Sequence, residues 1–338
     1  MTVKVVSGFN NIDHDKWKSF VKVHPEGNAF QLPAMSRVFR SAQNYKPVVV
    51  ACTDEDGDVK GVMQGTRICN GKGLICNMTA RVIVWGGPLA ENDDPEYITL
   101  LLKAFTEQVK NDCVYCEIRN LEVLTPRQKE LFTNSGFIYF PHLNILVNTE
   151  REEEDILKHL EPAKRRNVKK ALKEGLKFGE IKSAEELHQA YDILKEVYKK
   201  TEVPLSDISL FESLFFKGKE DDLCRFYKVV SDGQMAGVMV TLVNNNSMYE
   251  WYVAGKEEFF SKRPNEFLVW NVMLEAKKQG LSFFDFGGAG KPDKEYGVRD
   301  FKKGFGGELI ETGRFRRVFK KVPWLLGNTA IKMKKLFK

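Results

Sequence analysis

The chain lacks the segments that would place it across a membrane or send it for export. Among its 338 residues there is no apolar run of about 18 residues, the length that a spanning helix requires. Its first ten residues, MTVKVVSGFN, contain no charged stretch followed by an apolar one, so we expect no signal peptide. The composition, 43% hydrophobic and 12% aromatic, is that of a globular protein, and we expect it in the cytoplasm.

Cysteine and histidine are scarce, which argues against several kinds of site. Six cysteines indicate reduced thiols rather than a disulfide framework. Cys113 and Cys116 form a CxxC, but they lie in a strand-like run, where side chains three residues apart face opposite sides. Because there is no second CxxC and no histidine pair, we expect no metal site. The five histidines also join no Ser/His/Asp pattern with an elbow motif.

Basic residues are concentrated in the C-terminal segment. The net charge is +6, and residues 314–338 hold nine Lys and Arg without an Asp or Glu. Apolar residues are interleaved with these charges: Phe319, Val322, Trp324, Leu325, Leu326, Ile331, Leu336 and Phe337. This mixture is typical of a helix that lies on an anionic membrane. The alternative is a helix that packs on its own domain and exposes a basic face to solvent.

The order of expected strands and helices occurs twice along the chain. Each half contains a β-hairpin with a Gly-Val-Met triplet, at Gly61 and at Gly237, and later a helix that leads into a strand. We predict an internal duplication of a mixed α/β unit of about 150 residues. The expected boundaries are 1–150 for the first unit, closed by a strand over 137–147, 151–313 for the second unit, and 314–338 for the basic segment.

The stretch Leu281–Gly307 combines an aromatic strand with a glycine-rich break and a charged helical segment. It reads LSFFDFGGAGKPDKEYGVRDFKKGFGG. The Phe-Asp-Phe-Gly-Gly and Phe-Lys-Lys-Gly-Phe-Gly parts of this stretch resemble the signature of the Fem peptidyltransferases. The resemblance continues upstream through Trp251–Gly255 and Arg263–Leu268 and, more weakly, covers most of the chain.

This resemblance implies a fold and a function. Fem proteins consist of two acetyltransferase-like (GNAT) units and add amino acids from aminoacyl-tRNA to the peptide of cell-wall precursors. We therefore expect an α/β fold of two tandem GNAT-like units, with aminoacyl-tRNA and a lipid-linked or nucleotide-linked peptidoglycan precursor as substrates. Attack of an amine on an ester needs neither ATP nor a cofactor, and it needs mainly that the two substrates are aligned. The C-terminal segment would hold the protein at the inner membrane face.

The resemblance also implies candidate catalytic residues. Lys302, the lysine after Phe301, matches the family's lysine that stabilises the reacting centre, where a fixed cation lowers the barrier. Alternatively, Lys302 and Lys303 decorate a surface helix. Asp285, at the end of its strand, is expected either to accept a proton or orient Lys302, or to cap the following turn.

Further residues are candidates for substrate binding. In the second half, Trp251 and Tyr252 fall where GNAT proteins splay two strands to admit substrate, although core packing is the default for Trp251. The basic helix around residues 161–171 offers cations for a diphosphate or an RNA backbone, unless it is a solvated face. The complete set of substrate-binding candidates is Phe301, Lys303, Tyr252, Trp251, Arg165, Lys164, Lys169, Gly287 and Gly288.

Two other functions stay open. A GNAT-type N-acyltransferase could take acyl-CoA and modify a sugar or lipid amine, but the glycines of the usual pyrophosphate loop are missing where the sequence reads Lys262-Arg263-Pro264. A non-catalytic protein of the same fold that binds a membrane surface is the second alternative, because a fold alone does not establish an activity.

Overall fold

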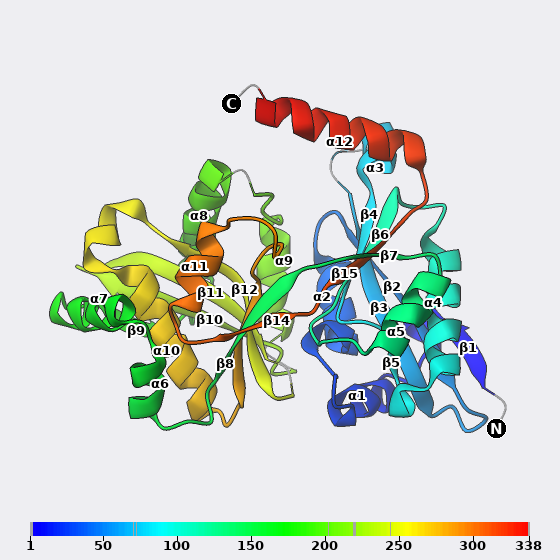
Figure 1. Ribbon diagram of the computed structural model, residues 1–338, viewed down its shortest axis with the longest axis horizontal. Helices are drawn as coiled ribbons and strands as arrows, with labels where there is room; N and C mark the ends of the chain where they lie inside the picture. The colour runs from blue at the N-terminus through cyan, green and yellow to red at the C-terminus, as the bar shows by residue number, and fades with distance from the viewer. Residues whose placement is uncertain are drawn as a thin grey trace. The chain divides into compact units, whose positions relative to one another are not determined.

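A computed structural model describes residues 3–69, 71, 73–201, 203–218, 221–243 and 245–336. The chain divides into two compact units, which are coloured by position along the chain in Figure 1. Unit 1 consists of Met1–Pro141 with Thr312–Lys338, and unit 2 of His142–Glu311. Each unit is a mixed sheet covered by helices, so the predicted fold class of two GNAT-like α/β units is confirmed.

Unit 1 is built on a sheet with the strand order β1-β2-β3-β4-β6-β15-β7, and β5 pairs with β3. Its strands are β1 (Lys4–Ser7), β2 (Tyr45–Thr53), β3 (Val59–Ile68), β4 (Arg81–Trp85), β5 (Leu89–Ala90), β6 (Tyr115–Arg119), β7 (Ile138–Phe140) and β15 (Arg314–Val318). Its helices are α1 (His14–Val23), α2 (Pro33–Ser41), α3 (Gly73–Thr79), α4 (Pro95–Val109), α5 (Pro126–Asn134) and α12 (Lys321–Leu336).

Alternation along the strands gives unit 1 a core on each face of its sheet. Val50 and Cys52 of β2 join the core on which α4 packs, whereas Val49 and Ala51 join the core that contains Trp17 of α1. Successive side chains of a strand point to opposite faces, so one strand supplies both cores.

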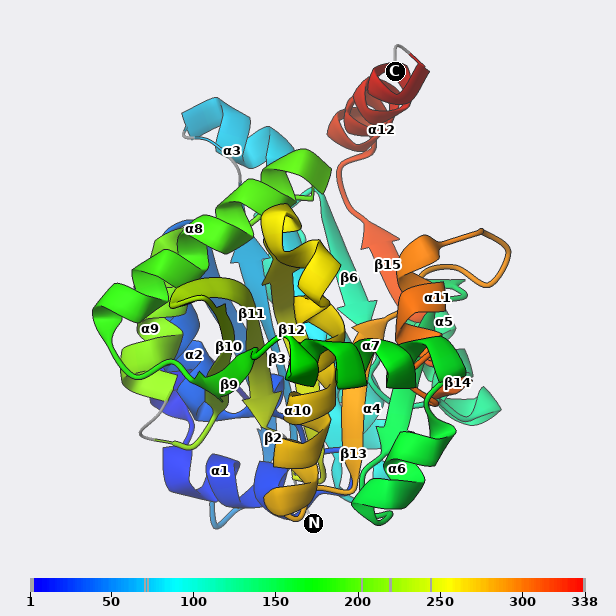
Figure 2. The same cartoon turned by 90° about the vertical axis from the view of Figure 1, so that its left-hand side faces the viewer.

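Unit 2 is built on a sheet with the strand order β14-β8-β13-β12-β11-β10-β9. Its strands are β8 (Leu143–Asn148), β9 (Lys177–Glu180), β10 (Cys224–Ser231), β11 (Gln234–Val243), β12 (Ser247–Gly255), β13 (Phe283–Gly288) and β14 (Glu308–Glu311). Its helices are α6 (Glu153–His159), α7 (Pro162–Lys173), α8 (Ala184–Thr201), α9 (Ile208–Ser213), α10 (Pro264–Lys278) and α11 (Gly297–Lys303). Figure 2 shows α7 crossing α10, with which it is in contact.

The two sheets share one plan of strands. In unit 2 the hairpin β10-β11 is followed by β12, which runs parallel to β13 after the crossover helix α10. In unit 1 the hairpin β2-β3 is followed by β4, which runs parallel to β6 after the crossover helix α4. This repeated order is what an internal duplication produces.

Each sheet also contains one strand that the boundaries expected from the sequence placed in a different part of the chain. The strand expected over 137–147 is interrupted at Pro141, giving β7 in unit 1 and β8 in unit 2, where β8 lies between β13 and β14. In return, β15 lies between β6 and β7 of unit 1. The expected boundaries at 150 and 313 therefore differ from the compact units, because the chain leaves unit 1 before β8 and returns to it with β15.

The C-terminal basic segment has two parts. Arg314–Val318 forms β15 within the sheet, and the helix α12 follows it. The ring of Trp324 packs on Tyr115 at 4.9 Å, while Val322, Leu325 and Leu326 are exposed. The expected apolar contributions of Ile331, Leu336 and Phe337 lie outside the described side chains. Within the part of the chain that the structure describes, no helix is long and apolar enough to cross a membrane.

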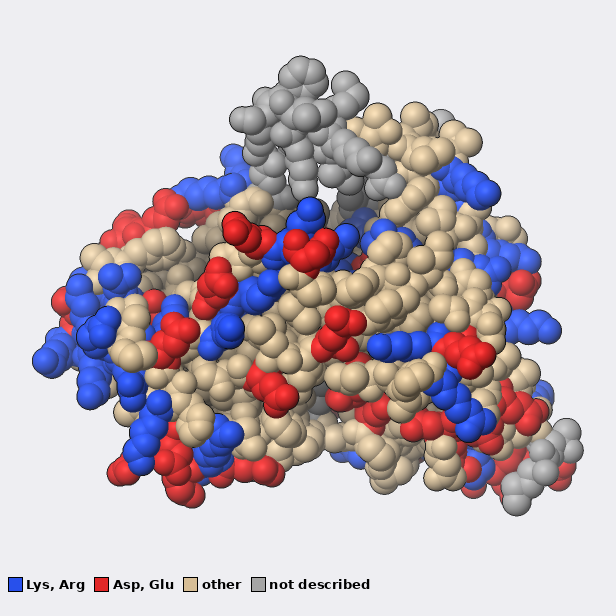
Figure 3. All heavy atoms as spheres, viewed as in Figure 1, with Lys and Arg blue, Asp and Glu red and all other residues tan. Residues whose placement is uncertain are grey.

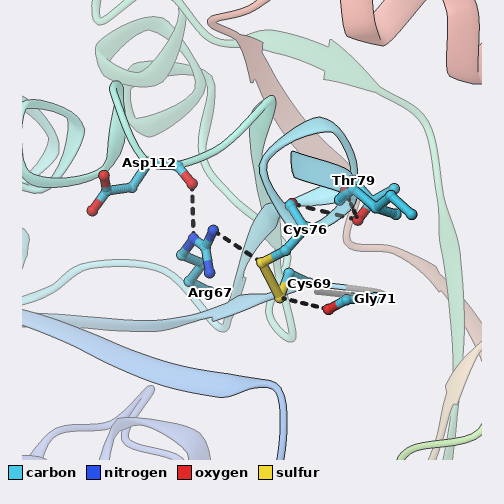
Figure 4. Close-up of a disulfide and its surroundings, with 7 residues drawn as sticks. Arg67, Cys69, Gly71, Cys76, Thr79 and Asp112 are labelled. Carbon is cyan, nitrogen blue, oxygen red and sulfur yellow. Dashed lines mark hydrogen bonds between the residues drawn. A yellow bond between two sulfur atoms is a disulfide. The ribbon is translucent and has the colours of Figure 1, made fainter. Parts of the chain in front are cut away.

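The expectation that all six cysteines are reduced is wrong for two of them. Cys69, just after β3, forms a disulfide with Cys76 of α3, as Figure 4 shows. Their Cα atoms are 5.0 Å apart, within the range that a disulfide spans. Cys52, Cys113, Cys116 and Cys224 are buried free thiols, so the CxxC contributes small side chains to the core. The described residues contain no group of three or more potential His, Cys, Asp or Glu metal ligands.

An ion cluster fixes β15 in the sheet of unit 1. Glu117 of β6 is buried and pairs with Arg119 at 2.8 Å, with Arg314 at 3.5 Å and with Arg316. Burial by itself would raise the pKa of Glu117, but the three guanidinium groups outweigh burial and lower this pKa to about 2. Glu117 therefore remains a carboxylate in the folded chain at pH values where it would be protonated in the unfolded chain.

We predict that Glu117→Gln lowers the free energy of unfolding by about 3 kcal/mol at pH 7. Because the folded-state pKa is depressed, this contribution is complete above the unfolded pKa of about 4.3 and disappears as the pH falls towards 2. Urea unfolding of both proteins at several pH values measures the difference. Glu107→Gln removes an exposed pair with Lys110 and should leave the free energy of unfolding nearly unchanged, because solvent screens such a pair. Equal losses for the two variants, or a loss for Glu117→Gln that does not depend on pH, would contradict this account.

Candidate active site

Two parallel strands of unit 2 separate before they end. β12 pairs with β13 only through Ser247–Phe283, Met248–Phe284 and Tyr249–Asp285, although both strands continue beyond these pairs. In unit 1 the corresponding strands β4 and β6 stay paired over the whole of β4. We call residues 250–252 of β12 together with 286–288 of β13 the strand fork. Substrate sites of open α/β sheets gather at such carboxyl ends of parallel strands.

A β-bulge lies in each strand at the fork. In the pairing of β12 with β11, Val240 lies opposite Tyr252 and Thr241 opposite Glu250, so Trp251 is the extra residue. In the pairing of β13 with β8, the register shifts between Asp285 and Gly288. A bulge bends its strand and re-aims its side chains, and bulges are frequent beside active sites.

Lys302 joins the two strands at the fork. Its ammonium forms an ion pair with Glu250 of β12 at 3.1 Å and donates a hydrogen bond to the carbonyl oxygen of Phe286 on β13. The residue is only 9% exposed, so this ammonium lies inside unit 2 rather than on the surface of α11. A lysine ammonium has three N–H donors, and these two contacts use two of them.

Glu250 pairs with this ammonium, and the charge of Glu250 acts in turn on Tyr198. Burial raises the pKa of Glu250, while the positive charge of Lys302 opposes that shift. Burial, reinforced by the charge of Glu250, raises the pKa of Tyr198, which therefore keeps its phenolic proton. The sequence indicated neither residue, and the available signal was slight: an acidic residue within the strand-like run before Trp251 and Tyr252.

Asp285 caps the turn after β13, which is one of the two roles expected for it. Its Oδ1 accepts a hydrogen bond of 2.7 Å from the backbone N–H of Gly287, so the carboxylate caps the turn that ends β13. The carboxylate that pairs with Lys302 is Glu250. Gly287 has a φ of +65°, and a Cβ there would lie 2.9 Å from the hydroxyl of Tyr249, so the bend requires glycine. Gly288 continues β13 and pairs with Asn144.

The two aromatic candidates of β12 are partly buried at the fork. The hydroxyl of Tyr252 lies 2.7 Å from that of Ser206, and its ring contacts Phe211 at 4.8 Å. The ring of Trp251 packs against that of Tyr252 at 5.2 Å. Both side chains are thus held in place, which suits a binding surface that must present a fixed shape.

Lys164 and Phe301 contact each other and hold the helix α11 in place. The ammonium of Lys164 lies 3.6 Å from the centre of the Phe301 ring and 3.4 Å from a carboxylate oxygen of Glu266. Burial lowers the pKa of Lys164, while Glu266 opposes the shift. These contacts join α7, α10 and α11, so both residues fix the helix that carries Lys302.

The remaining basic candidates lie nearer the surface. Lys169 and Lys303 are exposed, and Arg165 is half-buried and donates to the carbonyl of Lys158 at 3.4 Å. Figure 3 shows Lys and Arg side chains gathered at the left, over the position of α7. The exposed cations of α7 are Arg166, Lys169, Lys170 and Lys173.

The first turn of α10 is the place where a GNAT protein would hold the diphosphate of CoA. Here the buried carboxylate of Glu266 occupies this turn and accepts a hydrogen bond of 2.9 Å from Asn167. Arg263, in the left-handed conformation, and Pro264 precede it in place of a glycine loop. An anionic side chain at a helix N-terminus uses the electrostatic attraction that would otherwise hold a phosphate. The residues present therefore do not fit a CoA diphosphate.

Known proteins resemble the chain in sequence. A family model described as an acetyltransferase (GNAT) domain matches residues 162–303. A lipid II:glycine glycyltransferase of Staphylococcus epidermidis is 21% identical over 89% of this chain and 90% of its own length. A lipid II:glycine glycyltransferase of Staphylococcus aureus is likewise 21% identical, over 89% of each chain.

Solved structures resemble the chain in fold. The crystal structure of FemX aligns with a TM-score of 0.74 at 18% identity, covering 96% of this chain and 99% of that one. A tandem GNAT protein from the clavulanic acid biosynthesis pathway aligns with a TM-score of 0.60 at 11% identity, covering 94% of this chain and 99% of that one.

The sequence relatives, the GNAT match and the paired units agree with the signature around Lys302. The GNAT match and the glycyltransferase relatives support an acyltransferase. The chain is therefore similar to the Fem acyltransferases in sequence and fold, and it is built from two GNAT-like units.

Proposed function

We propose that this enzyme transfers an amino acid from aminoacyl-tRNA to an amine of a lipid-linked peptidoglycan precursor. The observation that carries the proposal is the buried ammonium of Lys302, which bridges β12 and β13 where their pairing ends. The sequence relatives that bear the name lipid II:glycine glycyltransferase support the acceptor and make glycine the first amino acid to test.

The reaction exchanges one acyl bond for another. The acceptor nitrogen attacks the ester carbonyl that joins the amino acid to a ribose oxygen of the tRNA. A C–N bond forms, the C–O bond breaks, and the proton lost by the nitrogen ends on the ribose oxygen that leaves. A negative oxygen develops at the carbonyl during the attack, so the enzyme must place donors or a cation beside it.

The strand fork supplies groups of this kind. Beyond the Tyr249–Asp285 pair, backbone N–H groups of β12 and β13 are no longer used in the ladder between these strands. The third N–H of Lys302 is directed by its contacts with Glu250 and Phe286 and can donate to the developing oxyanion. Glu250, whose pKa is raised by burial, holds that ammonium in place through the ion pair.

The donor follows from the charges of α7 and α10. Glu266 at the first turn of α10 disfavours a CoA diphosphate, which argues against the acyl-CoA alternative. The exposed cations of α7 offer contacts for the phosphates of a tRNA, which needs a broad basic surface rather than a closed loop. No cofactor enters this scheme, and the acceptor places the enzyme at the cytoplasmic face of the inner membrane.

A reconstituted transfer assay tests the proposal. Purified chain is mixed with glycyl-tRNA and a lipid-linked precursor, and product is measured by mass spectrometry; we expect one added residue per acceptor amine. In a parallel melting experiment we expect no stabilisation by acetyl-CoA, because a ligand that binds the native state would raise Tm. Stabilisation by acetyl-CoA together with acetyl transfer would favour the N-acyltransferase alternative. The absence of both glycyl transfer and acetyl transfer would favour the non-catalytic alternative.

We predict that Lys302→Met lowers kcat by a factor of about 10² to 10³, the usual cost of losing one oxyanion donor. The change removes the ammonium from the fork but keeps an unbranched side chain of similar length. Lys278→Met, which changes an exposed lysine of α10, is the matched control and should leave kcat unaltered. Circular dichroism establishes that both variants are folded. Equal activity of Lys302→Met and the control would refute the role assigned to Lys302.

A further inference from the structure

Two helices of unit 1 that are distant in sequence lie side by side. The helix α3 follows β3, whereas α12 ends the chain, and the two helices are in contact. Figure 1 shows α3 beneath α12 at the top of the view, and in Figure 2 both helices lie at the top, with α3 to the left of α12. The Cys69–Cys76 disulfide ties α3 to the end of β3, and the packing of Trp324 on Tyr115 ties α12 to β6.

Both helices expose large apolar side chains. Ile75 and Met78 of α3 and Val322, Leu325 and Leu326 of α12 are between 44% and 69% exposed. Ile75 and Met78 are three positions apart, and Val322 precedes Leu325 and Leu326 by three and four positions, which places the exposed residues of each helix on one face. Other strongly exposed apolar side chains of the described residues, such as Val23, lie on other parts of the chain. An apolar surface that is exposed to water in this way indicates a binding site for another molecule or for a membrane.

The charges around this surface indicate which kind of partner it binds. Residues 67–81, which include α3, hold three Lys and Arg and no Asp or Glu, and residues 320–338, which include α12, hold six Lys and no acid. Two separate acid-free segments thus meet at one place. Apolar side chains with a surrounding excess of cations match a bilayer that exposes anionic headgroups above its acyl chains.

We propose that α3 and α12 together form a membrane-docking surface for an anionic lipid bilayer. The apolar side chains enter the headgroup region, and the lysines and arginines contact the anionic lipids. This inference rests on the proposed function, since a lipid-linked acceptor is reached from such a bilayer. A polyanion such as tRNA would satisfy the charges but leave the apolar side chains in water, so the bilayer fits better.

Vesicle flotation of the full chain tests this surface without requiring turnover. We expect binding to vesicles rich in phosphatidylglycerol and little binding to vesicles of phosphatidylcholine alone. Ile75→Asp with Met78→Asp, and separately Leu325→Asp with Leu326→Asp, should each reduce bound protein by about tenfold or more. Val23→Asp, at an exposed apolar residue of α1, should bind as wild type does.

Several outcomes would overturn the inference. Wild type that fails to float, or floats equally with both lipids, contradicts it, as does full binding by the α3 variant. Binding that tRNA abolishes and the apolar substitutions leave intact would assign the surface to RNA. Melting curves identify a variant that has lost its fold. Wild type that binds vesicles but transfers no amino acid defeats the proposed function alone, whereas transfer to a nucleotide-linked precursor without vesicle binding defeats the docking surface alone.

Discussion

The contact of Lys302 with Glu250 and the carbonyl of Phe286 is the interaction on which the site depends. A buried ammonium is costly unless it is paired, and here one partner comes from each of two separating strands. The contact therefore does two things at once: it satisfies the charge of Lys302, and it defines where β12 and β13 lie after their ladder ends. Lys164, between Glu266 and Phe301, holds the helix α11 that delivers Lys302 to this position.

In each sheet one strand comes from a part of the chain outside the boundaries expected for that unit. We refer to this as the exchange of β8 and β15. β8 takes its place between β13 and β14, and β15 takes the equivalent place between β6 and β7. For β15 the reason is specific: Glu117 is the buried carboxylate that collects Arg314 and Arg316. A strand without those arginines would leave a buried charge poorly compensated at that position of the sheet.

Local patterns were sufficient to predict much of the fold. The two mixed α/β units, the repeated order of hairpin, strand and crossover helix, and the importance of the stretch with Lys302 follow from glycine positions, hydrophobic periodicity and a family signature. The partners of Lys302 and Lys164 did not follow, because Glu250 and Glu266 are far from them along the chain and only the folded sheet brings them together. The exchange of β8 and β15 was missed for the same reason, because strand pairing is a long-range property. The Cys69–Cys76 disulfide joins residues only 7 positions apart and was missed because the low cysteine content indicated reduced thiols.

We infer that Lys302 and Glu250 act as one unit at the strand fork. A double-mutant cycle on kcat/KM for amino-acid transfer measures this coupling, using Lys302→Met, Glu250→Gln and the double variant. If the two residues act together, the double variant is no slower than Lys302→Met alone, because the ammonium that Glu250 positions is already gone. If the two losses instead multiply, each side chain acts independently, and the bridge between β12 and β13 is not what organises the site.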